Sequence, residues 1–244
     1  MKTAIIMTGQ ARTLGMCLPS LHWHVFRKVE DPHFFVSVAS EPEASQVEML
    51  AKKYPGRVTI EEVVQPNLAE PPASMALHAP FPLTPTKTPR VSPLQGICRQ
   101  LWHLSRGYRF AVLNGLEMAS TVIRCRFDLH FHKASLPIVA YSEDFFGPWW
   151  GRYGPGVNDR FGVMGQAAAK EYFRTWDKLP DMLIDGCPFH PETLVGESMR
   201  REGITIQNTL CAEFAIQRAD GSRETMLPSP GEVAEYSSQA FYTQ

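Results

Sequence analysis

Ionisable and apolar residues alternate along residues 124–132. Every second residue of this run is ionisable: Arg124, Arg126, Asp128, His130 and His132. On an extended chain these five side chains share one face. Guanidinium groups match the oxygens of a diphosphate, and an aspartate beside them can hold a divalent cation that bridges the same phosphates, with His130 as an extra metal ligand. A half-exposed strand with its charges in solvent explains the alternation equally well.

A second candidate site is the turn that follows the first apolar run, with Gly9, Gln10 and Arg12. Backbone N–H groups and the dipole of a following helix bind anions there, and Arg12 adds a positive charge. The sequence has neither a G-x-x-x-x-G-K-[ST] loop nor a G-x-G-x-x-G fingerprint. Because most strand-to-helix turns contain a glycine for steric reasons, this turn alone indicates little.

Residues 145–156 are rich in glycine, proline and aromatic residues. Trp149 and Trp150 either stack on a sugar or a base, or fill the core beneath a long loop. Asn158 and Asp159 follow and could contact sugar hydroxyls, and Asp159 is a candidate general base. Glu192 lies in the first turn of an expected helix, where helix capping explains it without catalysis.

Strands and helices alternate around these candidates. Apolar patterning indicates strands at residues 2–8, 34–39, 58–64, 121–131, 160–164, 204–206 and 214–217, and helices near 14–25, 42–54, 94–104, 166–176 and 191–201. This alternation predicts right-handed crossovers and a mostly parallel sheet. Ligands of such sheets bind at the carboxyl ends of the strands, where residues 124–132 emerge.

The composition excludes several classes. A chain of 244 residues fits one large domain, and a net charge of −1 gives no basic field for nucleic acid. No apolar run is long enough to span a bilayer, which leaves peripheral membrane contact open. The five cysteines form no C-x-x-C pair, which favours a reducing, cytoplasmic location.

Proline is enriched in one segment. The chain has 20 prolines, or about 8% against a usual level of about 5%, and they concentrate in residues 65–93. A long loop inside a compact domain is usually functional. We therefore predict that this segment lies over or beside the candidate site as a flap.

The motifs, taken in order, resemble a known family. Residues 9–13, residues 122–129, the pair Asn158-Asp159 and the helix opened by Pro191-Glu192 resemble segments of small bacterial and viral sugar transferases of surface-polysaccharide biosynthesis. Those proteins look like nucleotide-sugar glycosyltransferases of the GT-A type. The similarity runs from about residue 3 to about residue 217, and the Arg-x-Arg-x-Asp element is its most specific part.

This resemblance implies a fold and an activity. The fold would be a three-layer α/β/α, Rossmann-like GT-A domain with a mostly parallel sheet over residues 1–217, an insertion at about 65–93 and a tail at 218–244. The enzyme would be a hexosyltransferase-like glycosyltransferase that moves a sugar from a nucleoside-diphosphate sugar to a carbohydrate or other hydroxyl acceptor. The family usually uses Mn²⁺ or Mg²⁺.

In that reading, the nucleotide and its phosphates would contact Gly9, Gln10, Arg12, Arg124, Arg126 and Asp128, while Asn158 and Asp159 would orient the sugar. The usual Asp-x-Asp element is here Arg126-Phe127-Asp128. Either Asp128 binds the cation alone or with His130, or the arginines take over part of its charge. Two alternatives remain open: a nucleotidyltransferase, and a catalytically silent module that binds nucleotides or glycans.

Overall fold

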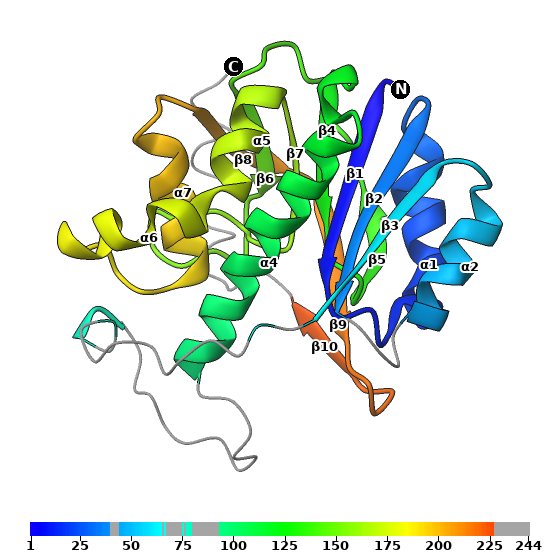
Figure 1. Ribbon diagram of the computed structural model, residues 1–244, viewed down its shortest axis with the longest axis horizontal. Coiled ribbons are helices and arrows are strands. Elements are labelled where there is room, and N and C mark those ends of the chain that lie inside the picture. The colour runs from blue at the N-terminus through cyan, green and yellow to red at the C-terminus, as the bar shows by residue number, and fades with distance from the viewer. Residues whose placement is uncertain (40–43, 65, 67–74, 76, 80–92, 227–244) are drawn as a thin grey trace.

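The computed structural model describes residues 1–39, 44–64, 66, 75, 77–79 and 93–226. Within these residues a central sheet of seven strands has the order β3-β2-β1-β4-β7-β6-β8 (Figure 1). Its strands are β1 (Thr3–Gly9), β2 (Pro32–Ala39), β3 (Val58–Val63), β4 (Thr121–Cys125), β6 (Asp144–Pro148), β7 (Phe161–Met164) and β8 (Thr205–Leu210).

The sheet is mostly parallel, as predicted. Strands β3, β2, β1 and β4 are parallel neighbours, β6 is parallel to β8, and β7 runs antiparallel to both β4 and β6. The middle of β1 is a continuous apolar run, and Ile5, Ile6 and Met7 are all fully buried. Burial on both faces is typical of a parallel strand covered by helices.

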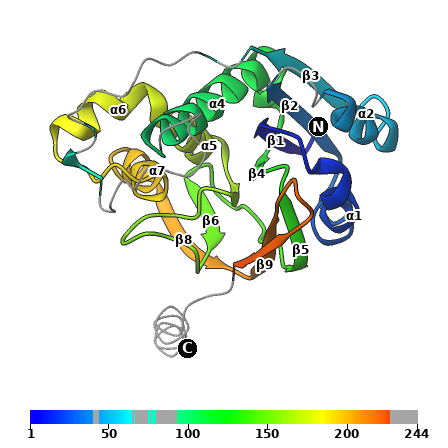
Figure 2. The same cartoon turned by 90° about the horizontal axis from the view of Figure 1, so that it is seen from below.

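Two layers cover the central sheet (Figure 2). One face carries α4 (Pro93–Leu113), α5 (Gln166–Phe173) and α7 (Pro191–Arg200), with α6 (Thr175–Ile184) packed on these helices. The other face carries α1 (Leu14–His24), α2 (Ala44–Lys53) and a second sheet of order β10-β9-β5. The strands of this second sheet are β5 (Leu129–Ala134), β9 (Ala212–Gln217) and β10 (Arg223–Met226), and the short 3₁₀ helices are η1 (Phe26–Lys28) and η2 (Leu116–Met118). The α/β fold class is confirmed, with a small sheet inside one outer layer.

The helical connections that follow β1 and precede β4 lie on opposite faces of the central sheet. The chain leaves β1 through α1 on one face and returns to β4 through α4 on the other face. Such a switch point opens a crevice at the carboxyl ends of the two strands. Gly9 ends β1 with a φ of 105°, which favours glycine. Gly107 brings α4 close to β1, because a Cβ at this position would collide with the side chain of Thr8.

The prediction of one strand over residues 121–131 is wrong. Strand β4 ends at Cys125, which pairs with Phe161 of β7. The chain then turns through residues 126–128 and enters β5, where Leu129 pairs with Ile216 of β9. Phe131 of β5 packs edge-on against Phe161, with the ring centroids 4.9 Å apart. Apolar packing between the two sheets therefore breaks the strand, and the five alternating side chains do not share one face.

Three other predictions are corrected in part. The tail expected from residue 218 contains a turn and then β10, which pairs antiparallel with β9. The loop expected at residues 145–156 begins within β6, and the helix expected over 166–176 divides at Arg174 into α5 and α6. None of the helices in the described ranges has the length and apolar character required to cross a membrane.

Most of the proline-rich segment, and with it the predicted flap, lies outside the described residues. Within its described part, the sulfur of Met75 lies 3.9 Å from that of Cys98 on α4. The carbonyl of His78 accepts a hydrogen bond of 2.7 Å from the backbone of Phe189. These contacts place Met75 and His78 against the layer that contains α4.

Candidate functional site

A cleft lies where the topology places the crevice, at the carboxyl ends of β1 and β4. Its volume is about 330 Å³, within the usual range for small-molecule sites. Three parts of the chain supply most of its walls: the turn after β1, the first half of α4, and the turn between β4 and β5. The lining residues are Thr8, Gly9, Gln10, Arg12, Thr13, Gly96, Arg99, Gln100, His103, Arg124, Arg126, Phe127, Asp128, Gln217, Arg218 and Ala219.

The cleft is strongly cationic. Its lining contains five arginines and one aspartate, which leaves four positive charges, whereas the whole chain carries a net charge of −1. Because a concave wall concentrates the field of its charges, the cleft attracts anions. Guanidinium groups in particular match the geometry of phosphate oxygens.

Arg124 extends from β4 into the floor of the cleft. It is 2% exposed, and its Nη1 donates a hydrogen bond of 3.0 Å to Oγ1 of Thr8. Its Nε is buried without a hydrogen-bond partner among the described residues. Burial lowers the pKa of Arg124 below the ordinary arginine value. Arg124 is therefore a buried cation that its protein neighbours only partly satisfy.

Helix α4 contributes a wall of the cleft that no sequence motif predicted. Arg99 and His103 line the cleft from one side of this helix, four residues apart. His103 is 4% exposed, and neither of its ring nitrogens has a hydrogen-bond partner in the described part of the chain. Burial, followed by the charges of Arg124 and Arg99, lowers the pKa of His103 to about 4. The imidazole is therefore neutral at pH 7, with one N–H available for a ligand.

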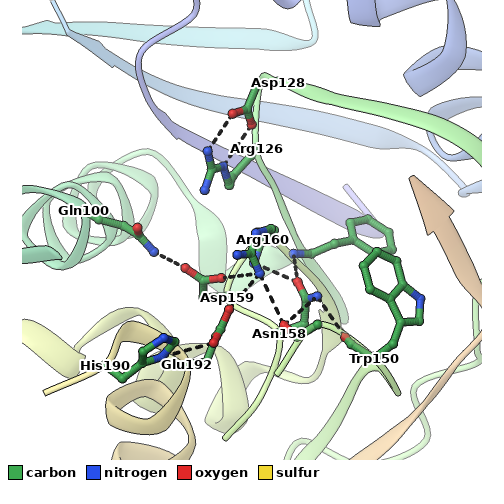
Figure 3. Close-up of polar contacts among 11 residues, drawn as sticks. Gln100, Arg126, Asp128, Trp150, Asn158, Asp159, Arg160, His190 and Glu192 are labelled. Atoms are coloured by element: carbon green, nitrogen blue, oxygen red, sulfur yellow. Dashed lines mark hydrogen bonds and ion pairs between the residues drawn. The ribbon is translucent and has the colours of Figure 1, made fainter. Parts of the chain in front are cut away.

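Arg126 and Asp128, which both line the cleft, form a bidentate ion pair (Figure 3). Nε of Arg126 lies 2.9 Å from Oδ1 of Asp128, and Nη2 lies 2.6 Å from Oδ2. Burial opposes ionisation of Asp128, but Arg126 outweighs it and lowers the pKa of the carboxyl. The pKa of Arg126 is raised in turn, because Asp128 outweighs the effect of burial. Both carboxylate oxygens are thus occupied by one guanidinium.

The donor set of the cleft does not fit a divalent cation. Asp128 is the only carboxylate among its described lining residues. The second expected ligand, His130, lies on β5 outside the cleft lining, and its ring packs against His132 with the centroids 5.4 Å apart. In the described ranges no three His, Cys, Asp or Glu side chains are placed to hold a metal ion.

A buried charged cluster lies behind the cleft (Figure 3). Asp159 is 2% exposed; its Oδ2 accepts a hydrogen bond from Gln100, and its Oδ1 lies 3.2 Å from Nη1 of Arg160. The same Nη1 donates a hydrogen bond of 2.8 Å to Glu192. Burial opposes ionisation of Asp159, but Arg160 and Arg126 lower the pKa of its carboxyl. A buried carboxylate with a lowered pKa is a poor proton acceptor.

Asn158 and Trp150 hold the loop before β7. Asn158 is fully buried; its amide donates to the carbonyl of Trp150 at 3.2 Å and its Oδ1 accepts from the backbone N–H of Arg160 at 3.0 Å. Trp150 is 1% exposed, and its indole donates to the carbonyl of Ala212 at 2.8 Å. Both polar ends of the Asn158 side chain therefore bind backbone groups.

Glu192 belongs to the buried cluster as well as to the start of α7. Its Oε2 lies 3.1 Å from Nδ1 of His190, and the ring of His190 stacks on Tyr153 at 4.5 Å. Burial, followed by the charge of Asp159, raises the pKa of Glu192 to about 7. Helix capping had accounted for this residue from the sequence, and only the three-dimensional structure reveals its neighbours.

Glu192 makes folding stability depend on pH in a defined direction. The folded state keeps a proton that an unfolded chain releases above pH 4.5, so its stabilisation is complete below that pH and is lost as the pH rises through about 7. We expect urea denaturation to show Glu192→Gln gaining stability relative to the wild type between pH 5 and 8, by at most about 3 kcal/mol. Glu197→Gln on the same helix should show no such gain. Parallel pH profiles of Glu192→Gln and the wild type would contradict this assignment.

The structure therefore divides the candidate residues. Six of them line one cleft: Gly9, Gln10, Arg12, Arg124, Arg126 and Asp128. Asp159 lies behind the cleft and reaches it through Gln100, Asn158 anchors a loop, and His130 belongs to the second sheet. The sequence signal for the wall formed by α4 was a polar stripe beside the apolar stripe of this helix. The polar stripe contains Arg99, Gln100 and His103.

The fold and the cleft together define an α/β protein with a cationic cleft at the carboxyl edge of its sheet. No protein-family model matches the sequence, and no curated protein matches it significantly. Among solved structures, the chain is similar to the galactosyltransferase LgtC in complex with donor and acceptor sugar analogues. The identity is 12%, the TM-score is 0.45, and the match covers 80% of this chain and 70% of that one. A likeness at this level assigns no function.

Proposed function

We propose that this chain transfers a sugar from a nucleoside-diphosphate sugar to a hydroxyl group of a carbohydrate acceptor. The observation that carries this proposal is the cleft at the switch point between β1 and β4, with five arginines in its lining. A diphosphate is the part of a sugar nucleotide that needs such a site. The motifs that resemble nucleotide-sugar glycosyltransferases contribute to two of its walls, through residues 9–13 and 124–128.

The proposed chemistry is a substitution at the anomeric carbon of the donor sugar. The bond between that carbon and the diphosphate oxygen breaks, the acceptor oxygen forms the new bond, and the acceptor hydroxyl releases its proton to solvent water. The nucleoside diphosphate leaves with the electron pair, so negative charge grows on its phosphate oxygens. Arg99, Arg124 and Arg126 stabilise that charge with donors that are already in place.

We assign the other candidate residues by their positions. Gly9, Gln10 and Arg12 contact the nucleotide side of the donor from the turn after β1. Asp159 acts as a positioning residue, because it holds Gln100 against the cleft and pairs with Arg160. Its burial and lowered pKa support this role over that of general base.

The test is a panel of nucleoside-diphosphate sugars, with binding measured by calorimetry and turnover by release of nucleoside diphosphate. Slow hydrolysis without an acceptor and faster release with a glycan acceptor are expected. Arg99→Ala should weaken binding about tenfold, whereas Arg109→Ala, on the same helix but outside the cleft, should not. Failure of every sugar nucleotide to bind would refute the proposal, and binding without any turnover would favour the silent module. Release of pyrophosphate from a nucleoside triphosphate and a sugar phosphate would favour the nucleotidyltransferase.

A further inference from the structure

We propose that the cleft binds a diphosphate with its own arginines and His103 and needs no divalent cation to do so. This inference rests on the proposed function, since it concerns how the same site holds the donor. It also departs from the expectation that Mn²⁺ or Mg²⁺ accompanies the donor.

The charge of the cleft already matches that of the ligand. A nucleoside diphosphate carries about three negative charges near neutral pH. The lining residues provide four positive charges after Asp128 is counted. In an enzyme that uses a cation, protein carboxylates hold the ion and the ion neutralises the phosphates. Here the protein supplies the positive charge directly.

Three residues that line the cleft have buried polar atoms without partners. They are Nε of Arg99, Nε of Arg124 and both ring nitrogens of His103, one of which carries the N–H of the neutral imidazole; none has a hydrogen-bond partner among the described residues. A buried donor left unsatisfied costs about 1–3 kcal/mol, so a native structure retains one for a reason. Because all three residues line the cleft, an oxyanion bound there could accept hydrogen bonds from the two arginine Nε–H groups and from the single N–H of His103.

The carboxylates that could hold a cation are engaged elsewhere. Both oxygens of Asp128 pair with Arg126, and the oxygens of Asp159 contact Gln100 and Arg160. A cation at Asp128 would have to displace Arg126 and would lie in a cleft that also contains Arg124 and Arg99. Repulsion between like charges opposes that arrangement. The side chains present thus favour an anion with no accompanying metal.

The test compares ligand binding to the full chain with and without metal. Inorganic pyrophosphate and the four nucleoside diphosphates ADP, CDP, GDP and UDP are titrated by calorimetry in EDTA and then in Mn²⁺ or Mg²⁺. We expect at least one of these ligands to bind in EDTA, with a Kd within about threefold of its value in metal. Such binding should weaken at higher salt, because dissolved ions screen the attraction between the arginines and the phosphates.

The variant Asp128→Asn separates the two modes of binding. If Asp128 only pairs with Arg126, removing its charge frees the guanidinium and tightens binding in EDTA by about threefold to tenfold. If Asp128 held a cation, the same variant would weaken binding and abolish any effect of Mn²⁺. His103→Ala should weaken binding in EDTA about tenfold, and Arg109→Ala serves as the matched control for both variants because it lies outside the cleft.

The outcomes distinguish this inference from the proposed function. Binding that appears only with metal, or that Asp128→Asn abolishes, would overturn the inference of metal-free diphosphate binding. The proposed glycosyl transfer would remain unaffected. Pyrophosphate binding in EDTA without binding of any sugar nucleotide would support metal-free diphosphate binding and refute the proposed function. No binding of any probe under either condition would overturn both.

Discussion

Replacing Arg124 with methionine is expected to have opposite effects on ligand binding and on stability. Binding of nucleoside diphosphates should weaken at least about 100-fold, because the variant lacks the guanidinium group of Arg124 in the cleft. Each hydrogen bond to a charged group contributes about 1.5–3 kcal/mol. The melting temperature of the free protein should rise by a few degrees. Calorimetry and thermal unfolding of the same preparation measure the two effects.

The gain in stability follows from the surroundings of Arg124. The residue is 2% exposed, and its hydrogen bonds are to Oγ1 of Thr8 at 3.0 Å and, more weakly, to the carbonyl of Cys125 at 3.5 Å. In the described part of the chain no carboxylate forms a salt bridge with it. Burying a charge without a paired partner costs several kcal/mol, and an apolar side chain of similar volume often restores that energy. Function and stability therefore oppose each other at this residue.

The control for this prediction is Arg109→Met. Arg109 is largely exposed and pairs with Asp177 at 2.8 Å, away from the cleft. Its replacement should leave diphosphate binding unchanged and lower stability by less than about 1 kcal/mol. Arg124→Met could instead lower the melting temperature and leave binding unchanged. Arg124 would then be a structural residue, and its assignment as a diphosphate-binding residue of the cleft would be contradicted.

The sequence alone predicted the elements that have strong local signals. The apolar runs of β1 and β2 and the break at Pro55-Gly56 after α2 are visible without any tertiary information. The alternation of strands and helices then sufficed to predict a mostly parallel sheet. It also placed Arg124 and Arg126 at the carboxyl edge of that sheet, where the structure has them.

Features that depend on long-range packing were not predictable in this way. The alternation over residues 124–132 is the pattern of a single strand, and only the pairing of β5 with β9 shows that the chain changes sheets after Cys125. Asn158 and Glu192 were read from residue type and local position. Their roles depend on partners 8 and 32 residues away in the sequence, at Trp150 and Arg160.

Replacing Trp150 with alanine should have the largest effect on folding of any change in the loop before β7. The side chain is 1% exposed, its ring lies 4.8 Å from that of Phe214, and its indole N–H donates to Ala212. Truncation of a buried tryptophan costs about 3–5 kcal/mol. We expect urea denaturation to show a loss of that size, with the same slope against denaturant as the wild type.

Two further variants identify the source of this loss. Trp150→Phe keeps most of the ring but removes the hydrogen bond to Ala212, so it should cost about 1–2 kcal/mol. Trp149→Ala should cost less than Trp150→Ala, because Trp149 is only half-buried against the same core.

The alternative role for Trp150, a platform on which a sugar or base stacks, predicts a different result. In that case Trp150→Ala would leave the free energy of unfolding nearly unchanged and would weaken binding of a sugar nucleotide. The contacts of Trp150 favour the core, because its ring faces Phe214 between the two sheets and its carbonyl accepts a hydrogen bond from the buried Asn158. Trp150 thus anchors the loop that leads directly into Asp159 and Arg160.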